Sequence, residues 1–441
     1  MSKSPAATAD SASAPDTCCG LRPDRLLLTN VVSNYATVAW SSGLTFLAIP
    51  ILLNLLGSAQ WGIVALCTAV QGALNILDAG MSQIAPRHFA AARSNSRRIA
   101  ELFGLLSTIY AAVGVLGFLV VQVGATLFVT IFSPSASATP EFATALRVLS
   151  VQFLFQFSNN ANVGFWTGTE SQKLGNLRSC VFVTARYAFG LAVVYTTERS
   201  AVAYLITSAL ISMAECVSNH LYISGKLESV PIAREKWLEE AKNLAADTGG
   251  FTMAVLVGMV VSQLDRLYLS AVLPVAAFGT YSLAANLALA FMQLQHPLLR
   301  AALPTIVAGT RDNSSLLATA VFSLCVSPCI VAAIFAPELF GLWLGNKSVA
   351  MEAELPFRMI VSAVAINALY NLIYQHMLAA NARRAIVAIN CASIVCGVAV
   401  IAIGEFDADS ILGGMIWITT SLMQLTMGII WKVRYEKKKS Q

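Results

Sequence analysis

The chain has 441 residues, of which 57% are hydrophobic and only 12% are charged, with a net charge of +5 and a mean hydropathy of +0.69. Soluble domains contain about twice that charged fraction, so the composition excludes a soluble globular protein and predicts an integral membrane protein. The basic residues lie between hydrophobic segments and at the C-terminus, where they act as topology signals, which argues against nucleic acid as a partner.

Residues 1–25 are rich in Ser, Ala and Pro and lack the apolar core of a signal peptide, so they predict a disordered cytoplasmic leader. After them come stretches that are each long enough to cross roughly 30 Å of hydrocarbon as a helix. The twelve predicted spans are 28–55, 61–86, 101–132, 143–169, 180–197, 201–224, 248–273, 278–304, 316–344, 357–380, 384–404 and 410–431. They divide the chain into an N-terminal six-helix bundle (26–224), a cytoplasmic amphipathic linker (225–247), a C-terminal six-helix bundle (248–432) and a basic tail (433–441).

The loops between these spans differ in charge. Alternate loops, the leader and the tail contain most of the Lys and Arg, whereas the opposite loops contain only Arg199 and Lys347. This positive-inside pattern predicts that both termini lie in the cytoplasm. The loops on the opposite side are short, which argues against an external catalytic domain such as a membrane glycan polymerase or ligase would have.

The two predicted halves resemble each other. Leu55–Leu66 (LLGSAQWGIVAL) and Val272–Leu283 (VLPVAAFGTYSL) both place an aromatic–Gly pair where the chain re-enters the membrane. In a second match, Gln156 aligns with Asn367 and Asn160 with Asn371. An even number of spans separates the matched segments, so the halves have the same orientation. Parallel repeats of this kind are a transporter architecture, which predicts two six-helix bundles around a central cavity.

Several spans contain polar residues at helical spacing. Each stripe could line a water-filled cavity, or it could only hydrogen-bond between helices and hold the bundle together. Stripes in both halves favour a cavity that binds sugar hydroxyls through amides and phosphate through arginine. The candidate substrate-binding residues are Asn34, Gln71, Asn75, Gln156, Asn160, Arg266, Asn286, Gln293, Arg300, Asn367 and Asn371. For Arg300 the alternative is a side chain that reaches toward the cytoplasmic interface.

Three acidic residues lie deep in the spans, where an ionised group is costly and usually functional. Asp78, Asp265 and Glu215 are therefore candidates for ion coupling, in that order. Glu215 comes last because Arg186 lies at a similar depth on the preceding span. We expect the two side chains to form a structural ion pair that neutralises Glu215. The sequence contains no Walker loop, metal-binding motif or GxSxG elbow, so it predicts neither an enzyme nor a cofactor.

The segment "LLGSAQWGIVAL…ILDAGMSQIAPRHFA" and the segment "QLDRLYLSAVLPVAAFGTYSLAANL" at Gln263–Leu287 resemble the starts of the two halves of Wzx-type lipid-linked oligosaccharide flippases. These belong to the multidrug/oligosaccharidyl-lipid/polysaccharide (MOP) exporter superfamily. The residues that match the family pattern are Gly57, Gly62, Asp78, Gly80, Arg87, Asp265, Gly279 and Tyr281.

This resemblance implies a cationic central cavity and a cargo of polyprenyl-pyrophosphate-linked sugar repeat units. The cargo would move from the inner to the outer leaflet of a bacterial inner membrane for O-antigen, capsule or exopolysaccharide assembly, coupled to an ion gradient. Polysaccharide polymerase machinery would be a partner. The alternative is an ion-coupled drug or metabolite antiporter of the same superfamily. Arginines and amides outnumber buried carboxylates, which favours sugar pyrophosphate and assigns Arg266 and Arg300 to it.

Overall fold

The computed structural model describes residues 23–78, 80–132, 140–197, 199–228, 234–295, 298–299, 314–344, 347–380, 382–404 and 409–439. Within these ranges every regular element is a helix, which confirms the predicted all-α class. Most of the predicted leader lies outside the described residues, as do Arg300 and the middle of the predicted loop after the eighth span.

The first half begins with a long bent helix. α1 (Pro23–Leu74) changes direction at Gly57, whose backbone has φ 77° and ψ 167°, a conformation that is open essentially only to glycine. Its second leg continues through a short 3₁₀ turn, η1 (Asn75–Asp78), into α2 (Met81–Ala91). The remaining helices are α3 (Ser96–Phe132), α4 (Pro140–Gly168), α5 (Gln172–Thr196) and α6 (Ala201–Ser224).

The second half begins with α7 (Arg234–Val272), followed after Pro274 by α8 (Val275–Met292). The predicted boundary at 247/248 lies inside α7, so part of the linker segment and the seventh span form one continuous helix. The predicted ninth span is divided into α10 (Ser314–Val321), a π-helical turn η2 (Phe322–Val326), α11 (Ser327–Ile334) and α12 (Ala336–Leu344). The last helices are α13 (Lys347–Ala379), α14 (Arg383–Gly404) and α15 (Ile411–Lys439).

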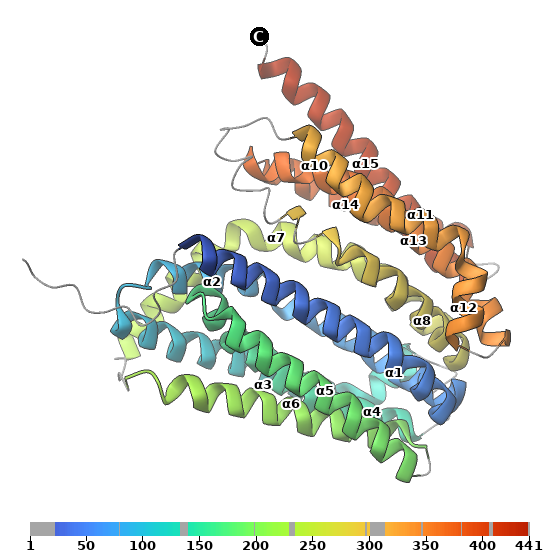
Figure 1. The fold of residues 1–441 in the computed structure, drawn as a ribbon, viewed down its shortest axis with the longest axis horizontal. Coiled ribbons are helices and arrows are strands. Elements are labelled where there is room, and N and C mark those ends of the chain that lie inside the picture. The colour runs from blue at the N-terminus through green and yellow to red at the C-terminus, as the bar shows by residue number, and fades with distance from the viewer. Residues whose placement is uncertain are drawn as a thin grey trace, which may run out of the picture.

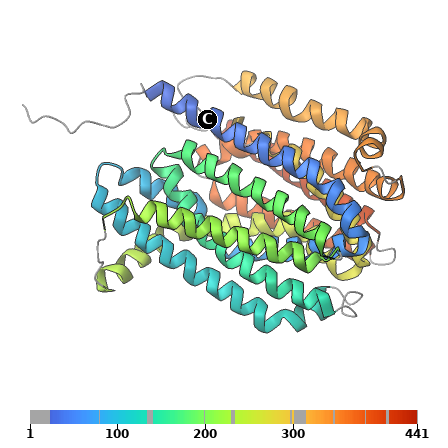
Figure 2. The ribbon, with the colours of Figure 1, turned by 60° about the horizontal axis from the view of Figure 1, so that its bottom comes forward.

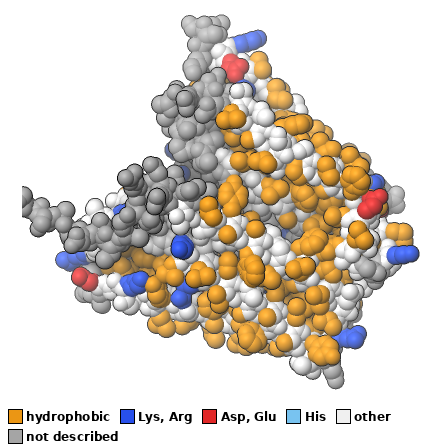
Figure 3. Space-filling view, in the orientation of Figure 1, with side chains coloured by type: hydrophobic (Ala, Val, Ile, Leu, Met, Phe, Trp, Pro, Cys, Tyr) orange, Lys and Arg blue, Asp and Glu red, His pale blue; other side chains and the backbone are white. Residues whose placement is uncertain are grey.

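The described helices agree with twelve passes. Eight helical stretches are long and apolar enough to cross a membrane, and the first of them supplies two passes because it bends at Gly57. The other three passes are α4, α7 and α13, which are long enough to cross but are interrupted by polar residues. Exposed hydrophobic side chains cover the face shown in Figure 3, while most charged side chains lie toward its left and right ends. The protein is therefore a multi-pass membrane protein.

The two halves repeat the same arrangement. In Figure 1 the first half occupies the lower part of the molecule and the second half the upper part, and Figure 2 shows the same long helices turned by 60°. α3 packs on α4 as α11 packs on α13, α4 on α6 as α13 on α15, and α5 on α6 as α14 on α15. The chain thus folds as two parallel repeats, as predicted.

The halves meet closely where α1 has just turned at Gly57. The Trp61 Nε1–H donates a hydrogen bond to the Gly279 carbonyl oxygen (3.2 Å). A Cβ atom at Gly279 would lie only 3.0 Å from the Gly62 Cα, so two glycines at equivalent repeat positions permit the helices to touch. This contact lies at the end of the molecule that the loop charges predict to be external.

Candidate functional site

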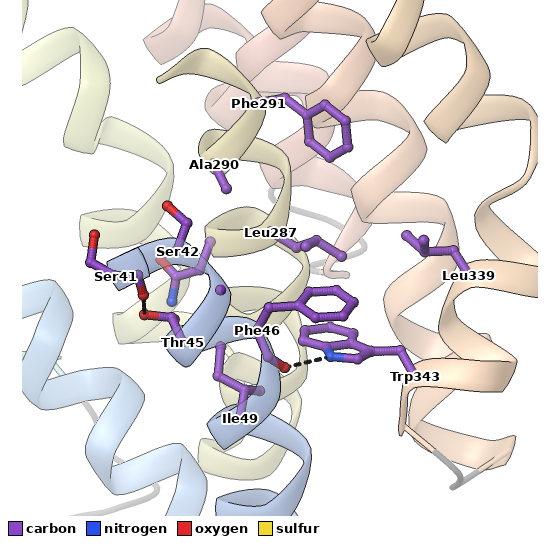
Figure 4. A pocket seen from close by; sticks show the side chains of 12 residues that line it. Ser41, Ser42, Thr45, Phe46, Ile49, Leu287, Ala290, Phe291, Leu339 and Trp343 are labelled. Carbon is purple, nitrogen blue, oxygen red and sulfur yellow. Dashed lines mark hydrogen bonds between the residues drawn. The ribbon is translucent and has the colours of Figure 1, made fainter. Parts of the chain in front are cut away.

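A cavity of about 450 Å³ lies between the first leg of α1 and the second-half helices α8 and α12 (Figure 4). Its walls are mostly apolar, with a few hydroxyls and one amide. The lining residues are Ser41, Ser42, Gly43, Thr45, Phe46, Ile49, Asn286, Leu287, Ala290, Phe291, Leu339 and Trp343. A pocket with this lining can hold a hydrocarbon chain and bind a polar group at its edge.

Phe46 and Trp343 form one wall of this cavity and join the two halves. Their rings stack with centroids 4.8 Å apart and an interplanar angle of 11°. The Trp343 Nε1–H also donates a hydrogen bond to the Phe46 carbonyl oxygen (2.7 Å), which is the dashed contact in Figure 4. The sequence did not predict either residue, because an aromatic side chain within an apolar span has no local signal that separates a cavity wall from a lipid-facing surface.

Arg266 provides a cation close to the cavity. Its Nη2–H donates to the Oδ1 atom of Asn286 (2.7 Å), and Asn286 is itself a lining residue. Among the residues that the structure describes, no carboxylate forms an ion pair with Arg266. The charge of Arg266 also interacts with the carboxylate of the adjacent Asp265, and a guanidinium within a membrane span usually faces a cavity or a partner. The pyrophosphate contact expected of Arg266 stays a prediction.

In the first half the predicted polar stripes form one internal hydrogen-bond network. The Gln71 Nε2–H donates to Gln156 Oε1, and the Gln156 Nε2–H donates to the Ser212 hydroxyl (3.3 Å). Arg186 also donates to Ser212 (3.3 Å) and pairs with Glu215 (3.3 Å). The predicted Arg186–Glu215 ion pair is confirmed. This network joins the second leg of α1 to α4, α5 and α6.

The second half contains a corresponding chain of amides. Asn371 donates to Asn367 Oδ1 (2.8 Å) and to Gln295 Oε1 (3.2 Å). Asn367 in turn donates to Gln424 Oε1 (3.2 Å), and Gln424 donates to Asn390 Oδ1 (3.3 Å). The sequence predicted Asn367 and Asn371 but not Gln424 or Asn390, which are isolated amides in otherwise apolar spans.

The other candidate residues lie in different places. Asn34 lies between α1 and α5, where it donates to Gln172 Oε1 (2.7 Å) and accepts from Asn176 (2.6 Å). Asn75 and Gln293 are exposed, and Asn160 is half-buried. The structure therefore distributes the predicted binding residues over a network within each bundle and the seam between the halves, and it does not gather them around one point.

The three acidic candidates are all buried or half-buried and differ in their partners. The Asp78 Oδ2 atom accepts hydrogen bonds from the Ser82 N–H (3.2 Å) and hydroxyl (2.8 Å), while its Oδ1 atom is buried without a partner. Asp265 accepts a hydrogen bond from the Tyr281 hydroxyl within the second half. Glu215 pairs with Arg186. Asp78 caps a break in a helix, and Tyr110 on α3 is a further neighbour of its carboxylate.

Comparisons with known proteins agree with this architecture. A model of the polysaccharide biosynthesis protein family (Polysacc_synt) matches residues 27–310. No curated protein matches the chain.

Solved structures share the fold at low sequence identity. They include an inward-facing multidrug resistance MATE family transporter of the MOP superfamily (13% identity, 92% of this chain and 96% of that chain, TM-score 0.66). Another is the MATE multidrug transporter DinF-BH, solved as a complex (11% identity, 93% and 95% coverage, TM-score 0.69). A third is a MOP superfamily transporter from Pyrococcus furiosus described as having a binding pocket of reverse polarity (14% identity, 94% and 93% coverage, TM-score 0.58).

Proposed function

Since the chain belongs to the polysaccharide biosynthesis protein family and is a transporter of the MOP superfamily, we propose that it flips polyprenyl-pyrophosphate-linked oligosaccharide repeat units across a bacterial inner membrane. The cargo would move from the inner to the outer leaflet by alternating access, for assembly of O-antigen, capsule or exopolysaccharide. Both termini would lie in the cytoplasm, and the polysaccharide polymerase machinery would receive the flipped unit.

The observation that supports this cargo is the pairing of an apolar cavity with a cation at its edge. The cavity between α1, α8 and α12 offers apolar walls to a polyprenyl chain. Arg266, held by Asn286, offers planar paired donors to a pyrophosphate. A lipid-linked pyrophosphate has both chemistries in one molecule, at adjacent positions.

The sugar portion would contact amides and hydroxyls. Asn75 and Gln293 are exposed, and Asn160 makes no side-chain hydrogen bond within the described residues, so these three have unused donors and acceptors. Asn34, Gln71, Gln156, Asn367 and Asn371 are already hydrogen-bonded, so they would have to exchange partners to bind a glycan. We rank the first three residues above the other five as glycan contacts.

An ion-coupled drug or metabolite antiporter is the second candidate, because the similar folds include multidrug transporters. A cationic drug would need a carboxylate at its site, and none of the residues that line the described cavity is acidic. The lining therefore favours the anionic lipid over a cationic drug.

Deletion of the gene followed by complementation tests the proposed function. We expect surface polysaccharide to disappear while its lipid-linked repeat unit accumulates in the inner leaflet, and the intact gene should reverse both effects. Normal surface polysaccharide in the deletion strain, together with increased sensitivity to cationic drugs, would instead establish the antiporter.

Arg266 gives a residue-level test in the same strain. We expect Arg266→Ala to reduce export by about tenfold to a hundredfold at normal protein level, because hydrogen bonds to a charged group contribute about 1.5–3 kcal/mol. Arg266→Lys should retain part of the export, since it keeps the charge and loses the paired donors. Arg147→Ala is the matched control, because Arg147 is an exposed arginine of α4 that does not line the cavity. Full export by both Arg266 variants would remove Arg266 from the anion site.

A further inference from the structure

A second group of cations lies away from the cavity, around the ring of Tyr222 near the end of α6. The Arg178 Cζ atom, on α5, lies 5.1 Å from the centroid of the Tyr222 ring. The Lys226 Nζ atom, just beyond α6, lies 4.5 Å from the same centroid. The Trp166 ring, on α4, lies 5.6 Å from it. Three helices thus bring two positive charges to one aromatic side chain.

Neither of these two cations forms an ion pair among the described residues, although Arg178 lies within electrostatic range of Glu215. Arg178 donates only to neutral oxygens, Oδ1 of Asn219 (2.6 Å) and the Ser218 hydroxyl (2.5 Å). The acid on α6, Glu215, is already paired with Arg186. Other arginines at this end of the molecule differ, because Arg93 pairs with Glu170 and Arg98 pairs with Glu240. The two cations at Tyr222 are therefore accessible to an anion without breaking an ion pair of their own.

The two cations supply the donors of the cluster. Trp166 is only 6% exposed, and its ring packs beside Tyr222 inside the protein. The Arg178 guanidinium and the Lys226 ammonium suit a ligand with several acceptor oxygens, such as a phosphate ester.

The position of the cluster identifies the kind of phosphate. Arg178 lies in the second turn of α5, and Lys226 lies two residues beyond the end of α6, at the membrane edge that is predicted to face the cytoplasm. On the same two helices Leu177 and Leu221 are 62% and 66% exposed, so an apolar surface adjoins the cations. A ligand that places a phosphate on the cations and hydrocarbon along these leucines is a membrane phospholipid.

We propose that Arg178 and Lys226 form a binding site for the phosphate of an anionic phospholipid in the cytoplasmic leaflet. The lipid binds both cations and joins the ends of α5 and α6. The site is separate from the cavity at Arg266, and it does not depend on which cargo the protein transports. A cytoplasmic leaflet rich in anionic lipid attracts basic residues at this level, each with about a fivefold gain in affinity.

The test uses the full chain purified in a neutral detergent. Phosphatidylglycerol and phosphatidylcholine are titrated separately, and thermal unfolding and lipid retention by native mass spectrometry are measured. We expect phosphatidylglycerol to raise the unfolding temperature more than phosphatidylcholine does. Arg178→Gln/Lys226→Gln should bind phosphatidylglycerol about thirtyfold more weakly, the loss of two basic contacts. The matched control, Lys173→Gln, removes an exposed cation one turn before Arg178 and should keep the wild-type shift.

Several outcomes would overturn the site. One is a wild-type protein with no preference for phosphatidylglycerol, and another is a double variant that keeps the full shift. If the double variant fails to fold, the single variant Lys226→Gln tests the site, because Lys226 lies outside the helices and its substitution should leave the fold intact. This variant should bind phosphatidylglycerol about fivefold more weakly, and unchanged binding would exclude the site.

Two further ligands separate the possible sources of phosphate. Excess inorganic phosphate should not displace phosphatidylglycerol, since it lacks the acyl chains that contact Leu177 and Leu221. Polyprenyl pyrophosphate should stabilise the double variant as much as the wild type, since its proposed site is at Arg266. If polyprenyl pyrophosphate displaces phosphatidylglycerol and loses its effect in the double variant, the cluster binds cargo and the phospholipid assignment is wrong. Failure of the flippase proposal would leave the phosphatidylglycerol result unchanged.

Discussion

At the scale of single residues, several positions that match the family pattern determine how helices turn and pack against each other. Gly62 and Gly279 allow two helices of different halves to touch. Asp265 is only 1% exposed and accepts a hydrogen bond from Tyr281, so it ties α7 to α8 inside the second half. Such residues determine the fold shared by a superfamily, whereas the residues that line the cavity are free to differ with the cargo.

Asp78 is the family-pattern residue that we assign to ion coupling. It is 5% exposed, it caps α2 through Ser82, and one of its oxygens has no hydrogen-bond partner. Tyr110 on α3 is a neighbour of the carboxylate. A proton or a sodium ion bound to Asp78 would occupy its unpaired oxygen and weaken the hydrogen bonds to Ser82. Because Asp78 lies between the second leg of α1 and α2, ion binding would then change the angle between these two helices.

We therefore predict that Asp78→Asn, which keeps the size and hydrogen bonding but removes the charge, uncouples transport from an ion gradient. Transport by reconstituted vesicles should no longer increase when a proton or sodium gradient is imposed. Glu215→Gln is the comparison, because Arg186 neutralises Glu215 and its loss should mainly reduce stability. A full response of the Asp78→Asn vesicles to both gradients would exclude Asp78 as the coupling group.

At the scale of helices, the breaks decide where each pass ends. α1 would otherwise be one helix of 52 residues, and Gly57 divides it through a backbone conformation with positive φ. The second half makes the equivalent turn at Pro274, which lies between α7 and α8. Glycine and proline thus produce the same corner by different means, because the first permits a left-handed backbone and the second cannot continue the hydrogen bonding of a helix.

Gly57→Ala tests the first corner. We expect it to lower the stability by about 1–3 kcal/mol, because a side chain at φ 77° is strained even though nothing lies within 4 Å of the new Cβ. Gly104→Ala, in the interior of α3 with equally open space, should leave stability unchanged or raise it by up to about 1 kcal/mol. Thermal unfolding of the purified variants measures both, and an equal effect at the two positions would mean that the corner does not need glycine.

At the scale of the whole molecule, two parallel six-helix repeats enclose a cavity between them. Contacts between the halves join Trp61 with Gly279, and Phe46 with Trp343. They connect α1 to α8 and to α12. In Figure 1, α1 and α8 lie along this seam between the lower and upper halves. Relative movement of the two repeats would have to break these contacts, and it would change which side of the membrane reaches the cavity.

The orientation of this molecule in the membrane is a prediction from loop charge, and it can be measured directly. We predict that a cysteine at Ser410, before α15, reacts with an impermeant thiol reagent added outside intact cells. A cysteine at Ser94, between α2 and α3, should react only after the membrane is opened, since Arg93, Arg97 and Arg98 surround it. The chain's own cysteines provide the background to be subtracted. A reversed pair would invert the proposed direction of transport and the leaflet of the phospholipid site.

The sequence by itself determined the membrane class, the helical fold, the twelve passes and the repeat, because hydrophobic length, loop charge and turn residues act locally along the chain. It also identified the Arg186–Glu215 pair, since two ions at equal depth on consecutive spans must approach each other. Only the tertiary structure decided which polar residues meet. Gln424 and Asn390 entered the amide network, and Phe46 and Trp343 became cavity walls, because contacts between distant helices depend on how each helix is rotated. Rotation is set by packing across the whole bundle, and a nearly all-apolar span contains too little amphipathic pattern to reveal it.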